Sequence, residues 1–465
     1  MIQFFNTLSG QKEPFTPLEP GQVRLYTCGP TVYDHAHIGN FRAYIFEDLL
    51  KRFLQFEGFR VTHVMNITDV DDKTIRRANG RGIALDAFTA EYIQAFFEDL
   101  KVLRIEPADH YPRATEHIPD MVRIIRGLLD KGFAYRKDGA VYFSIARFPG
   151  YGKLSKIDLA ELRTTERVES DEYEKESPRD FALWKAPKED EPFWNSEIGP
   201  GRPGWHIECS AMSSKYLGPT FDIHCGGVDN IFPHHENEIA QSEAYWDRPF
   251  VRYWLHCHHL IVDGEKMAKS KGNFFTLRDL VEKRQADPMA LRYLLLSTHY
   301  RKVLNFTFEA LDQAQAALRR IRDFLYELDS RPFPAGKGPE IPDILAEARA
   351  KFVEGLGDDL NISLALTALF EMIKRINVLI KEDKLRADDA AEAAALVHSL
   401  DLVLAVLPPR RETTIPDELM RKIQAREQAR KDRNFKLADQ LRRELADAGL
   451  VLEDTKDGVR WKVLK

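Results

Sequence analysis

The sequence predicts an α/β protein with a parallel β-sheet in its first part and helical domains after it. Residues 23–27 and 61–65 are short apolar strand patterns, and a helical pattern separates them. A strand–helix–strand unit needs a crossover connection, which makes the two strands parallel. Residues 309–406 are the second observation, because their pattern is almost purely helical and rich in Ala and Leu.

The strand and helix patterns follow one another in a regular order. The helix between the first two strands places its apolar residues on one face, at Ile45, Phe46, Leu49, Leu50, Phe53 and Leu54. Residues 221–224 and 260–262 repeat the strand pattern. Residues 110–205 break the rhythm with a helix at 117–132, a hairpin near 140–143 and a charged, proline-bearing connection at 163–204.

These patterns predict three domains. A parallel-sheet domain covers 1–308 and includes residues 110–205 as an α+β insertion. An α-helical bundle covers 309–408, and Pro408-Pro409 then punctuates the chain. A small C-terminal domain of mixed helix and β structure covers 409–465, where a helical hairpin is expected.

Composition excludes several classes of protein. The chain has 465 residues, of which 44% are hydrophobic and 30% charged, so a disordered or fibrous chain is ruled out. It carries 67 Lys and Arg against 73 Asp and Glu, so any nucleic-acid surface must be a local patch. Residues 410–465 carry 15 basic against 11 acidic residues and are such a patch, although a weak one.

The cysteines and the N-terminus indicate the compartment. Four scattered cysteines are too few for a disulfide scaffold in a chain of this length. The first residues lack the basic head and apolar run of a signal peptide, and no apolar stretch reaches membrane-spanning length. We therefore expect a cytoplasmic, multidomain, enzyme-like protein with reduced thiols and no membrane association.

Polar groups follow the predicted strands where each one ends. Ligands of open parallel sheets bind beyond the carboxyl ends of the strands, so we expect these groups to converge on one crevice. They are Cys28, Asn66 with Thr68, His224 with Cys225, and the Asp263-Gly264 loop. The alternative is that strand ends meet turns, which are polar in any protein.

A candidate phosphate site lies between the first strand and its helix, in the segment HAHIGN at 35–40. Gly39 lacks a Cβ, so a flat ligand such as adenine can lie against the backbone there. The helix N-terminus offers free N–H groups to phosphate, and His37 and Asn40 add donors.

A second candidate is the lysine loop, GEKMAKSKGN at 264–273. Three lysines within six residues form a cationic loop that can close on a triphosphate and balance charge on a leaving pyrophosphate. The alternative is an ordinary solvated turn.

These segments resemble the His-Ile-Gly-His and Lys-Met-Ser-Lys-Ser signatures of class I aminoacyl-tRNA synthetases. Further blocks are similar to the cysteinyl-tRNA synthetase family: YTCGPTVYD at 26–34, NITDVDDK at 66–73, GWHIECSAM at 204–212 and FPHHENEIAQS at 232–242. The resemblance continues through DDLN at 358–361 to VLEDTKDGVRW at 451–461, so it spans nearly the whole chain. Asn40 and Ala268 depart from the two signatures, and we expect altered rates rather than lost function.

A metal site is indicated by spacing and completed by the resemblance. His234 and Glu238 are four residues apart, so on a helix they share one face. Two thiolates would complete a donor set that suits zinc, although spacing leaves open which cysteines join. The resemblance selects Cys28 and Cys209. A second metal site at Cys225 or Cys257-His258-His259 is the less favoured reading, because buried cysteines usually act as small apolar residues.

The resemblance implies a Rossmann-like catalytic domain and an ATP-dependent ligation of L-cysteine to tRNA(Cys) through a cysteinyl-adenylate. One Zn²⁺ per chain would select the thiol, and Mg²⁺ would accompany ATP. It assigns catalysis and ATP binding to His37, Gly39, Asn40, Lys266 and Lys269, and cysteine binding to Gly29, Thr68, Trp205, His224 and Asp229. Residues 250–308 would carry the lysine loop and contact the tRNA stem. Arg426, Arg430, Arg433 and Trp461 would contact tRNA, and a monomer is expected.

Three alternatives remain open at this point. Asp69, Asp71 and Asp72 resemble a Mg²⁺ cluster, yet capping and local salt bridges explain them equally well. A ligase that joins cysteine to an amino-sugar in mycothiol synthesis would share the zinc and both signatures, but would not need the chain after about residue 410. A zinc-stabilised RNA-binding protein without catalysis is the third reading, which the lysine loop disfavours.

Overall fold

The structure is a computed structural model that describes residues 1–157, 177, 179–408, 417–448, 450–455 and 458–463. The chain forms two compact units. The first comprises Met1–Ala316, Glu347–Glu371 and Leu400–Val406, and the second comprises Ala317–Ala346, Met372–Ser399 and Leu407–Lys465. All of the predicted catalytic, cysteine-binding and metal-binding residues belong to the first unit.

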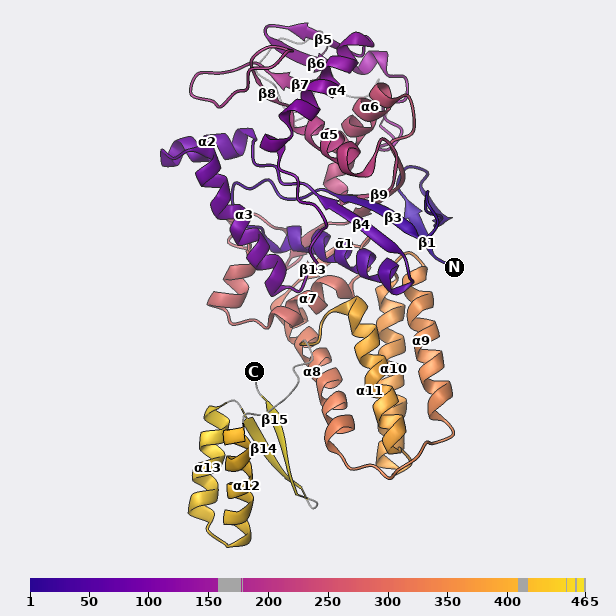
Figure 1. Cartoon of the computed structure of the whole chain (residues 1–465), viewed down its shortest axis with the longest axis vertical. Helices are drawn as coiled ribbons and strands as arrows, with labels where there is room; N and C mark the ends of the chain where they lie inside the picture. Colours follow the sequence, from indigo (N-terminus) through magenta and orange to yellow (C-terminus); the bar gives the residue numbers. More distant parts are fainter. Residues whose placement is uncertain (158–176, 178, 409–416, 449, 456–457, 464–465) are drawn as a thin grey trace. The chain divides into compact units, whose positions relative to one another are not determined.

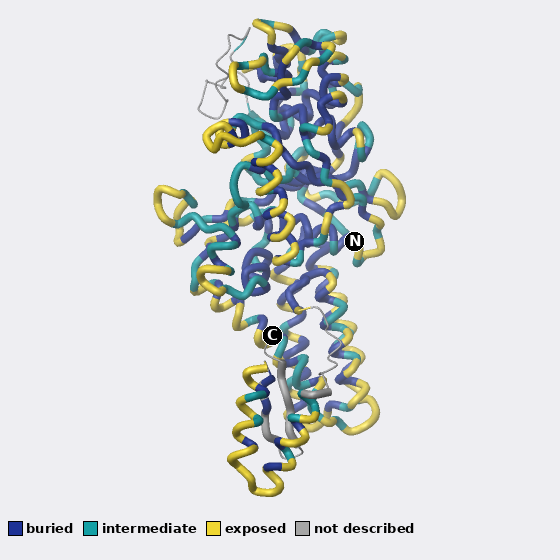
Figure 2. The backbone as a smooth tube through the Cα atoms, turned by 60° about the vertical axis from the view of Figure 1, so that its left-hand side comes forward, coloured by how far each residue is buried: buried dark blue, intermediate teal, exposed yellow. Residues whose placement is uncertain are grey.

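A four-stranded parallel sheet lies at the centre of the first unit (Figure 1). Its strands are β3 (Gln22–Thr27), β4 (Arg60–Met65), β9 (Phe221–Gly227) and β10 (Val251–Cys257), in the order β10-β9-β3-β4. The predicted strands at 23–27, 61–65 and 221–224 are therefore confirmed. The strands are buried over most of their length, as expected for a parallel sheet covered on both faces (Figure 2).

The prediction that residues 260–262 form a further strand of this sheet was wrong. Residues 260–262 do form β11 (Leu260–Val262), but it pairs with β12 (Glu265–Lys266) and β13 (Leu304–Phe306) in a separate sheet. Strand β10 was not predicted, and it pairs with β9 at one edge of the parallel sheet. A short apolar run shows that a strand is buried, and it does not show which sheet the strand joins.

Helices cover both faces of the parallel sheet. Helix α1 (Ile38–Phe56) crosses one face between β3 and β4, and α5 (Trp205–Leu217) and α6 (Glu236–Trp246) lie on the other (Figure 1). The remaining helices of this part are α2 (Asp72–Arg81), α3 (Leu85–Val102) and α7 (Pro288–Ser297). Short helical turns lie at Ala114–Glu116, Ile145–Arg147, Val228–Asn230, Ile231–His235, Lys269–Lys271 and Asp279–Lys283.

The insertion forms its own antiparallel sheet, in the order β5-β6-β7-β8. It contains α4 (Ile118–Asp130), β5 (Ala134–Lys137), β6 (Ala140–Phe143), β7 (Phe181–Lys185) and β8 (Arg202–Pro203). The predicted hairpin is confirmed as β5–β6. Much of the predicted charged connection, at 158–176 and 178, lies outside the described residues. A further hairpin, β1 (Gln3–Asn6) and β2 (Gln11–Pro14), opens the chain.

The predicted helical region is also confirmed. It consists of α8 (Phe308–Ser330), α9 (Ile341–Gly357), α10 (Ile362–Lys381) and α11 (Ala387–Leu404). The C-terminal part contains the expected helical hairpin, α12 (Asp417–Lys431) and α13 (Phe435–Asp447), followed by β14 (Leu450–Thr455) and β15 (Gly458–Val463). Leu445, Leu450 and Leu452 form part of the small core that joins the hairpin to the strands.

A buried ion pair ties α1 to α7 within the first unit. The side chains of Asp48 and Arg292 are fully buried, and Arg292 Nη2 lies 2.5 Å from Asp48 Oδ2. Arg292 also donates to the carbonyls of Leu404 and Leu103, at 2.8 and 3.0 Å. Burial opposes ionisation of Asp48, but the charge of Arg292 outweighs it and holds the pKa of that carboxyl below its usual value.

We predict that Asp48→Ala destabilises the protein by about 3–5 kcal/mol, because it leaves the Arg292 guanidinium buried and unpaired. Chemical unfolding followed by tryptophan fluorescence measures the change. Glu91→Ala is the control, since it removes an exposed pair with Arg81 and should cost less than about 1 kcal/mol. Equal effects of the two substitutions would contradict the prediction.

Candidate active site

The four predicted metal-binding residues converge in the structure. Cys28 follows β3, Cys209 lies on α5, and His234 and Glu238 lie just before and within the first turn of α6. One ligand atom from each lies within 4.8 Å of the others. Glu238 Oε1 is buried, 3.1 Å from His234 Nε2, and accepts no hydrogen bond among the described residues. An unsatisfied carboxylate oxygen beside two thiols and an imidazole is a donor set that fits a zinc ion.

A second, overlapping set of ligand atoms shares Cys28 and Glu238 with the first and adds His224 and His235. His224 Nε2 lies 3.0 Å from Glu238 Oε2, and His235 Nε2 lies 3.2 Å from Cys28 Sγ. His235 was not predicted as a site residue, although it is adjacent to His234 in the sequence. Each histidine contacts a residue of the first set, as groups that orient metal ligands do.

The pKa values of the two thiols in the metal-binding set shift in opposite directions. A hydrogen bond to Cys209 and burial raise the pKa of the Cys28 thiol. Burial also opposes ionisation of Cys209, but the hydrogen bond from Cys28 and the charge of His234 bring the pKa of Cys209 well below its usual value. Burial lowers the pKa of His224 to about 3, so its imidazole is neutral at physiological pH. The pKa values of the two thiols, which interact with each other, are thus shifted in opposite directions.

Aromatic and imidazole rings fix the position of His234. The Trp205 ring stacks on it, with centroids 4.1 Å apart and planes 22° from parallel. His206 Nδ1 lies 2.9 Å from His234 Nδ1, which leaves Nε2 of His234 facing Glu238. Trp205 was predicted to enclose the substrate, and it lies directly against the metal-binding set.

A chain of hydrogen bonds connects the ends of β3 and β4 to α5. The Gly29 N–H donates to Asn66 Oδ1 at 2.9 Å, and Asn66 Nδ2 donates to Thr68 Oγ1 at 3.1 Å. Thr68 Oγ1 in turn donates to Glu208 Oε2 at 2.8 Å. The chain joins two predicted cysteine-binding residues, Gly29 and Thr68, through Asn66. Sequence analysis did not single out Glu208, whose one visible signal was its place beside Cys209.

Gly29 has no room for a side chain. A Cβ at this position would lie 1.8 Å from the carbonyl oxygen of Asn66 and 2.9 Å from the Met65 side chain. The contact with backbone cannot be relieved by a rotamer change. The approach of β3 to β4 at the site therefore requires glycine.

The phosphate motif caps helix α1. His37 is the N-cap, and its Nδ1 accepts a hydrogen bond from the Asn40 N–H at 3.2 Å. Asn40 Oδ1 accepts from the His37 N–H at 3.0 Å, which completes a reciprocal capping box. Asn40, which departs from the signature, thereby stabilises the helix start. Burial lowers the pKa of His37, which favours its neutral form.

The lysine loop reaches the phosphate motif even though β11 lies in another sheet. Lys269 Nζ lies 2.5 Å from Asp34 Oδ2, and the ammonium also lies 4.9 Å from the centroid of the Phe274 ring. The Ile38 N–H donates to the Phe275 carbonyl, so the segment after the loop contacts the start of α1. Lys266 is exposed within β12.

The three aspartates of the NITDVDDK block have separate protein partners. Asp71 is the N-cap of α2, Asp69 accepts two hydrogen bonds from Thr115, and Asp72 pairs with Lys185 and Arg202. This supports the capping and salt-bridge interpretation over a Mg²⁺ cluster. Asp229 is exposed and close enough to His37 to act on its charge.

Cys225 and Cys257 are both buried, and neither belongs to a metal-binding cluster in the described part of the chain. Burial raises the pKa of both thiols, to about 12 for Cys257. Both are expected to stay protonated, as suits small apolar core residues.

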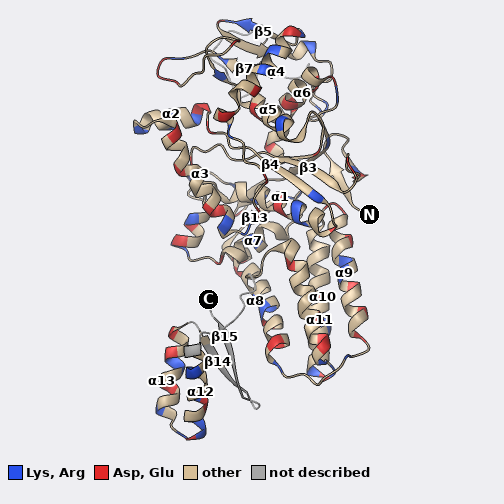
Figure 3. Ribbon diagram, viewed as in Figure 1, with Lys and Arg blue, Asp and Glu red and all other residues tan. Residues whose placement is uncertain are grey.

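The predicted tRNA-contacting residues divide into three cases. Arg430 and Arg433 are exposed, and α12 and α13 carry both basic and acidic residues (Figure 3). Arg426 is 3% exposed, so it does not present its guanidinium to RNA. Trp461 pairs with Leu452 across β14 and β15, but its side chain lies outside the described residues.

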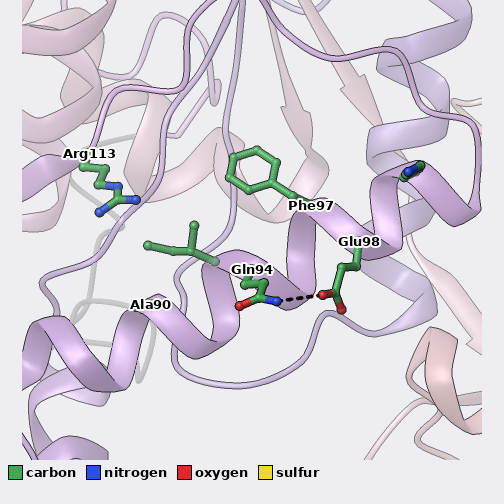
Figure 4. A pocket seen from close by; sticks show the side chains of 7 residues that line it. Ala90, Gln94, Phe97, Glu98 and Arg113 are labelled. Atoms are coloured by element: carbon green, nitrogen blue, oxygen red, sulfur yellow. Dashed lines mark hydrogen bonds between the residues drawn. The ribbon is translucent and has the colours of Figure 1, made fainter.

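A surface pocket of about 500 Å³ lies along α3 (Figure 4). Gln94 donates to Glu98 at its rim. None of its lining residues is a predicted site residue; they are Ala90, Ile93, Gln94, Phe97, Glu98, Lys101 and Arg113. Among the helices of the described ranges, none is long and apolar enough to cross a membrane.

Comparison with family models gives three matches along the chain. Residues 14–316 match the class I (C) tRNA synthetase catalytic domain, and residues 351–408 match the DALR domain. Residues 414–461 match the cysteinyl-tRNA ligase anticodon binding domain.

Curated relatives match over the full length. The chain is 51% identical to a cysteine–tRNA ligase from Solibacter usitatus (strain Ellin6076), covering 99% of each chain. It is also 51% identical to a cysteine–tRNA ligase from Chlamydia pneumoniae, covering 100% of this chain and 98% of the relative.

Solved structures with low sequence identity share the fold. A Mycobacterium tuberculosis methionyl-tRNA synthetase in complex with methionyl-adenylate has a TM-score of 0.57 at 16% identity, covering 83% of this chain and 90% of that one. A ternary complex of Agrobacterium radiobacter K84 agnB2 LeuRS with tRNA and LeuAMS has a TM-score of 0.59 at 13% identity, covering 84% and 85%. The class I synthetase fold, with its Rossmann-like parallel sheet, is thereby shown.

We predict that Cys209→Ser and His234→Asn weaken metal binding by more than about 100-fold. Loss of a residue that only orients a ligand costs about 10–100-fold, and loss of a ligand should cost more. Metal content after dialysis, with a chromophoric chelator as competitor, measures the affinity. Cys225→Ser is the matched control, because Cys225 is equally buried but outside both ligand sets.

His235→Asn distinguishes the two overlapping sets. If the first set holds the ion, this variant should lose no more than the 10–100-fold expected of an orienting residue. A greater loss in His235→Asn than in His234→Asn would assign the ion to the second set.

Proposed function

The chain belongs to the cysteine–tRNA ligase family and catalyses the ATP-dependent ligation of cysteine to tRNA(Cys). We propose which of its residues carry out each part of this reaction. The observation that carries the proposal is the convergence of two thiols, an imidazole and a carboxylate within 4.8 Å, next to the predicted cysteine-binding residues. The parallel sheet brings the elements that carry them to one edge.

The proposed metal is one Zn²⁺ per chain, held by Cys28, Cys209, His234 and Glu238. When bound, it supplies a soft Lewis acid that favours a thiol over a hydroxyl and lowers the pKa of a coordinated thiol. A site that recognises one specific bond discriminates by roughly 10⁴–10⁵, so cysteine is selected over serine without an editing domain. His224, which the sequence predicted as a cysteine-binding residue, is completely buried against Glu238, so we propose that it acts on the site by orienting that carboxylate.

In the first step, a carboxylate oxygen of cysteine attacks the α-phosphorus of ATP. The bond to the pyrophosphate oxygen breaks, which yields cysteinyl-adenylate. His37, Asn40 and the N-terminus of α1, with Gly39 beneath the adenine, would bind the nucleotide. Lys266 and Lys269 would neutralise charge on the departing pyrophosphate, together with Mg²⁺. To bind phosphate, Lys269 must give up its ion pair with Asp34. Breaking this pair costs little free energy, because the Lys269 side chain is exposed to solvent.

In the second step, the 2′-hydroxyl of the terminal tRNA adenosine attacks the activated carbonyl, and AMP leaves. Gly29, Thr68, Trp205 and Asp229 are proposed to hold the cysteinyl group in place. No nucleophilic side chain is needed, because orientation and charge stabilisation lower the barrier.

The proposed division of the chain is 1–308 for catalysis, 309–408 for the bundle and 409–465 for the anticodon. Family matches at 14–316, 351–408 and 414–461 support it. We assign tRNA phosphate contacts to Arg430 and Arg433 and acceptor-stem contact to the region 250–308, while Trp461 remains a prediction. We further propose that the protein acts as a monomer in the cytoplasm, where tRNA is charged.

The two other readings are not favoured. A cysteine:amino-sugar ligase has no use for an anticodon binding domain, which this chain matches at 414–461. An RNA-binding protein without catalysis would not need the lysine loop beside the phosphate motif.

The testing experiment is cysteine-dependent ATP–pyrophosphate exchange, with serine as control and tRNA charging in parallel. Exchange with cysteine but not serine, plus charging of tRNA(Cys), is the expected result. Exchange without charging would favour the small-molecule ligase, and no exchange would contradict the enzyme assignment.

We predict that Lys269→Ala lowers kcat for exchange by about 10²–10³-fold, because one donor to developing charge is removed. Lys271→Ala is the matched control. Lys271 lies two residues away on the same loop but pairs with Glu265, so its loss should change kcat by less than about threefold. Equal effects would show that only the net charge of the loop matters.

We predict that Arg430→Ala with Arg433→Ala raises KM for tRNA and leaves exchange unchanged. Each lost phosphate contact should reduce the slope of log affinity against log salt by about one. Filter binding from low to high salt measures this slope. An unchanged slope would remove both arginines from the RNA surface.

A further inference from the structure

We propose that an exposed basic face of helix α2 binds the backbone phosphates of the tRNA 3′ strand where that strand enters the active site. This surface, the α2 basic face, consists of Lys73, Arg76, Arg77 and Arg81. The inference rests on the proposed function, because it takes the terminal adenosine of tRNA as the acceptor of the cysteinyl group. It adds an RNA-binding surface on the first unit to the arginines proposed for the C-terminal hairpin.

Helix α2 separates its basic residues from its buried ones. The four basic side chains lie at positions i, i+3, i+4 and i+8, so they share one side of the helix, and all four are exposed. Thr74, Ile75 and Ala78 are buried on the other side. The only acidic residue within α2 is Asp72, which pairs with two cations of the insertion. The exposed side of α2 therefore presents positive charge to solvent.

Acidic residues of neighbouring elements neutralise only part of the α2 basic face. Arg77 lies 3.2 Å from Asp34, and Arg81 lies 2.9 Å from Glu91. Among the described residues, no acidic side chain forms an ion pair with Lys73 or Arg76. Two cations of this face therefore remain available to an anionic partner.

The Tyr33 ring holds two of the basic side chains in place. The Lys73 ammonium lies 5.4 Å from the ring centroid, and the Arg77 guanidinium lies 5.1 Å from it. Arg77 also donates to the Tyr33 carbonyl at 3.2 Å. Long side chains that are ordered before binding lose less entropy when they bind. The α2 basic face is therefore partly preorganised, unlike a helix face whose long side chains are free in solvent.

The α2 basic face adjoins the proposed ATP site. Asp34 Oδ2 accepts from Arg77 at 3.2 Å and from Lys269 of the lysine loop at 2.5 Å, so one carboxylate joins the two surfaces. Helix α2 begins after its N-cap Asp71, which is three residues beyond Thr68 of the proposed cysteine site. The α2 basic face thus lies next to the carboxyl edge of the parallel sheet.

The proposed reaction requires RNA phosphates at this edge. The 2′-hydroxyl of the terminal adenosine must reach the activated carbonyl, so the nucleotides that precede it have to lie just outside the active site. Each of these nucleotides carries a phosphate, and lysine and arginine position RNA through such phosphates. ATP is the other polyphosphate in the reaction, but its proposed partners are the phosphate motif and the lysine loop. The α2 basic face therefore fits the incoming RNA strand.

The test measures how tightly the full-length protein binds tRNA(Cys) over a range of salt concentrations, by filter binding. Lys73→Ala with Arg76→Ala should weaken binding about 10-fold and reduce the slope of log affinity against log salt by about two, because two phosphate contacts are lost. Arg60→Ala with Arg252→Ala is the matched control. It removes two exposed arginines at the amino ends of β4 and β10, on the opposite edge of the sheet, and should leave the slope unchanged.

A trimmed RNA locates the contact. A tRNA(Cys) from which the single-stranded 3′ end has been removed keeps its stems and its anticodon but lacks the strand that enters the active site. The unaltered protein should bind this RNA more weakly than intact tRNA. Lys73→Ala with Arg76→Ala should weaken its binding no further, because the strand that these residues contact is already absent.

ATP–pyrophosphate exchange separates failure of this inference from failure of the proposed function. The α2 variant should exchange at the unaltered rate, because the first step does not involve tRNA. Loss of exchange in the variant would assign these cations to ATP and overturn the inference. An unchanged salt slope, an equal fall in the control, or equal weakening of intact and trimmed RNA would also overturn it. Absence of exchange in the unaltered protein would instead overturn the proposed function.

Discussion

The register of three parallel strands determines where the groups at the strand ends, Cys28, Thr68 and His224, lie. Tyr26 of β3 is in register with Val64 of β4 on one side and with His224 of β9 on the other. Two residues after Tyr26, the chain leaves the sheet at Cys28, beside the turn that carries Asn66 and Thr68. Because parallel strands end at the same edge, the thiol, the hydroxyl and the imidazole need no long loops to meet. A slip of one residue in β3 would turn Cys28 away from the other ligands.

The oxygens of buried carboxyl groups in the first unit are satisfied by different kinds of partner. Asp48 is neutralised by Arg292, and Glu236 is held by backbone N–H groups. Both of these carboxyl groups find their partners within the protein itself. Glu238 retains an oxygen without a hydrogen bond, and Glu208 has no cationic partner among the described residues.

The sequence alone predicted most of the elements but not all of their partners. Helical and strand periodicity identified three strands of the parallel sheet, the insertion hairpin and the helical domains, because burial on one face leaves a regular apolar pattern. It placed 260–262 in the wrong sheet and missed β10, since strand order depends on contacts between distant segments. Resemblance, rather than spacing, selected Cys28 and Cys209. Glu208 and His235 escaped notice because their importance comes from side chains far away in the sequence. The burial of Arg426 could not be predicted either, because the helix carries charges of both signs and has no clear apolar face.

Gly29 has a consequence at the level of mutation and selection. Every missense change at its codon introduces a Cβ, and that atom would overlap the backbone of the adjacent strand. No substitution at this position is therefore expected to be neutral, so genetic drift cannot replace the glycine. An inhibitor that drew its affinity from the Gly29 main chain would face a target unable to escape by substitution at that residue. Resistance would have to arise from side chains further out, where changes leave the two strands in contact.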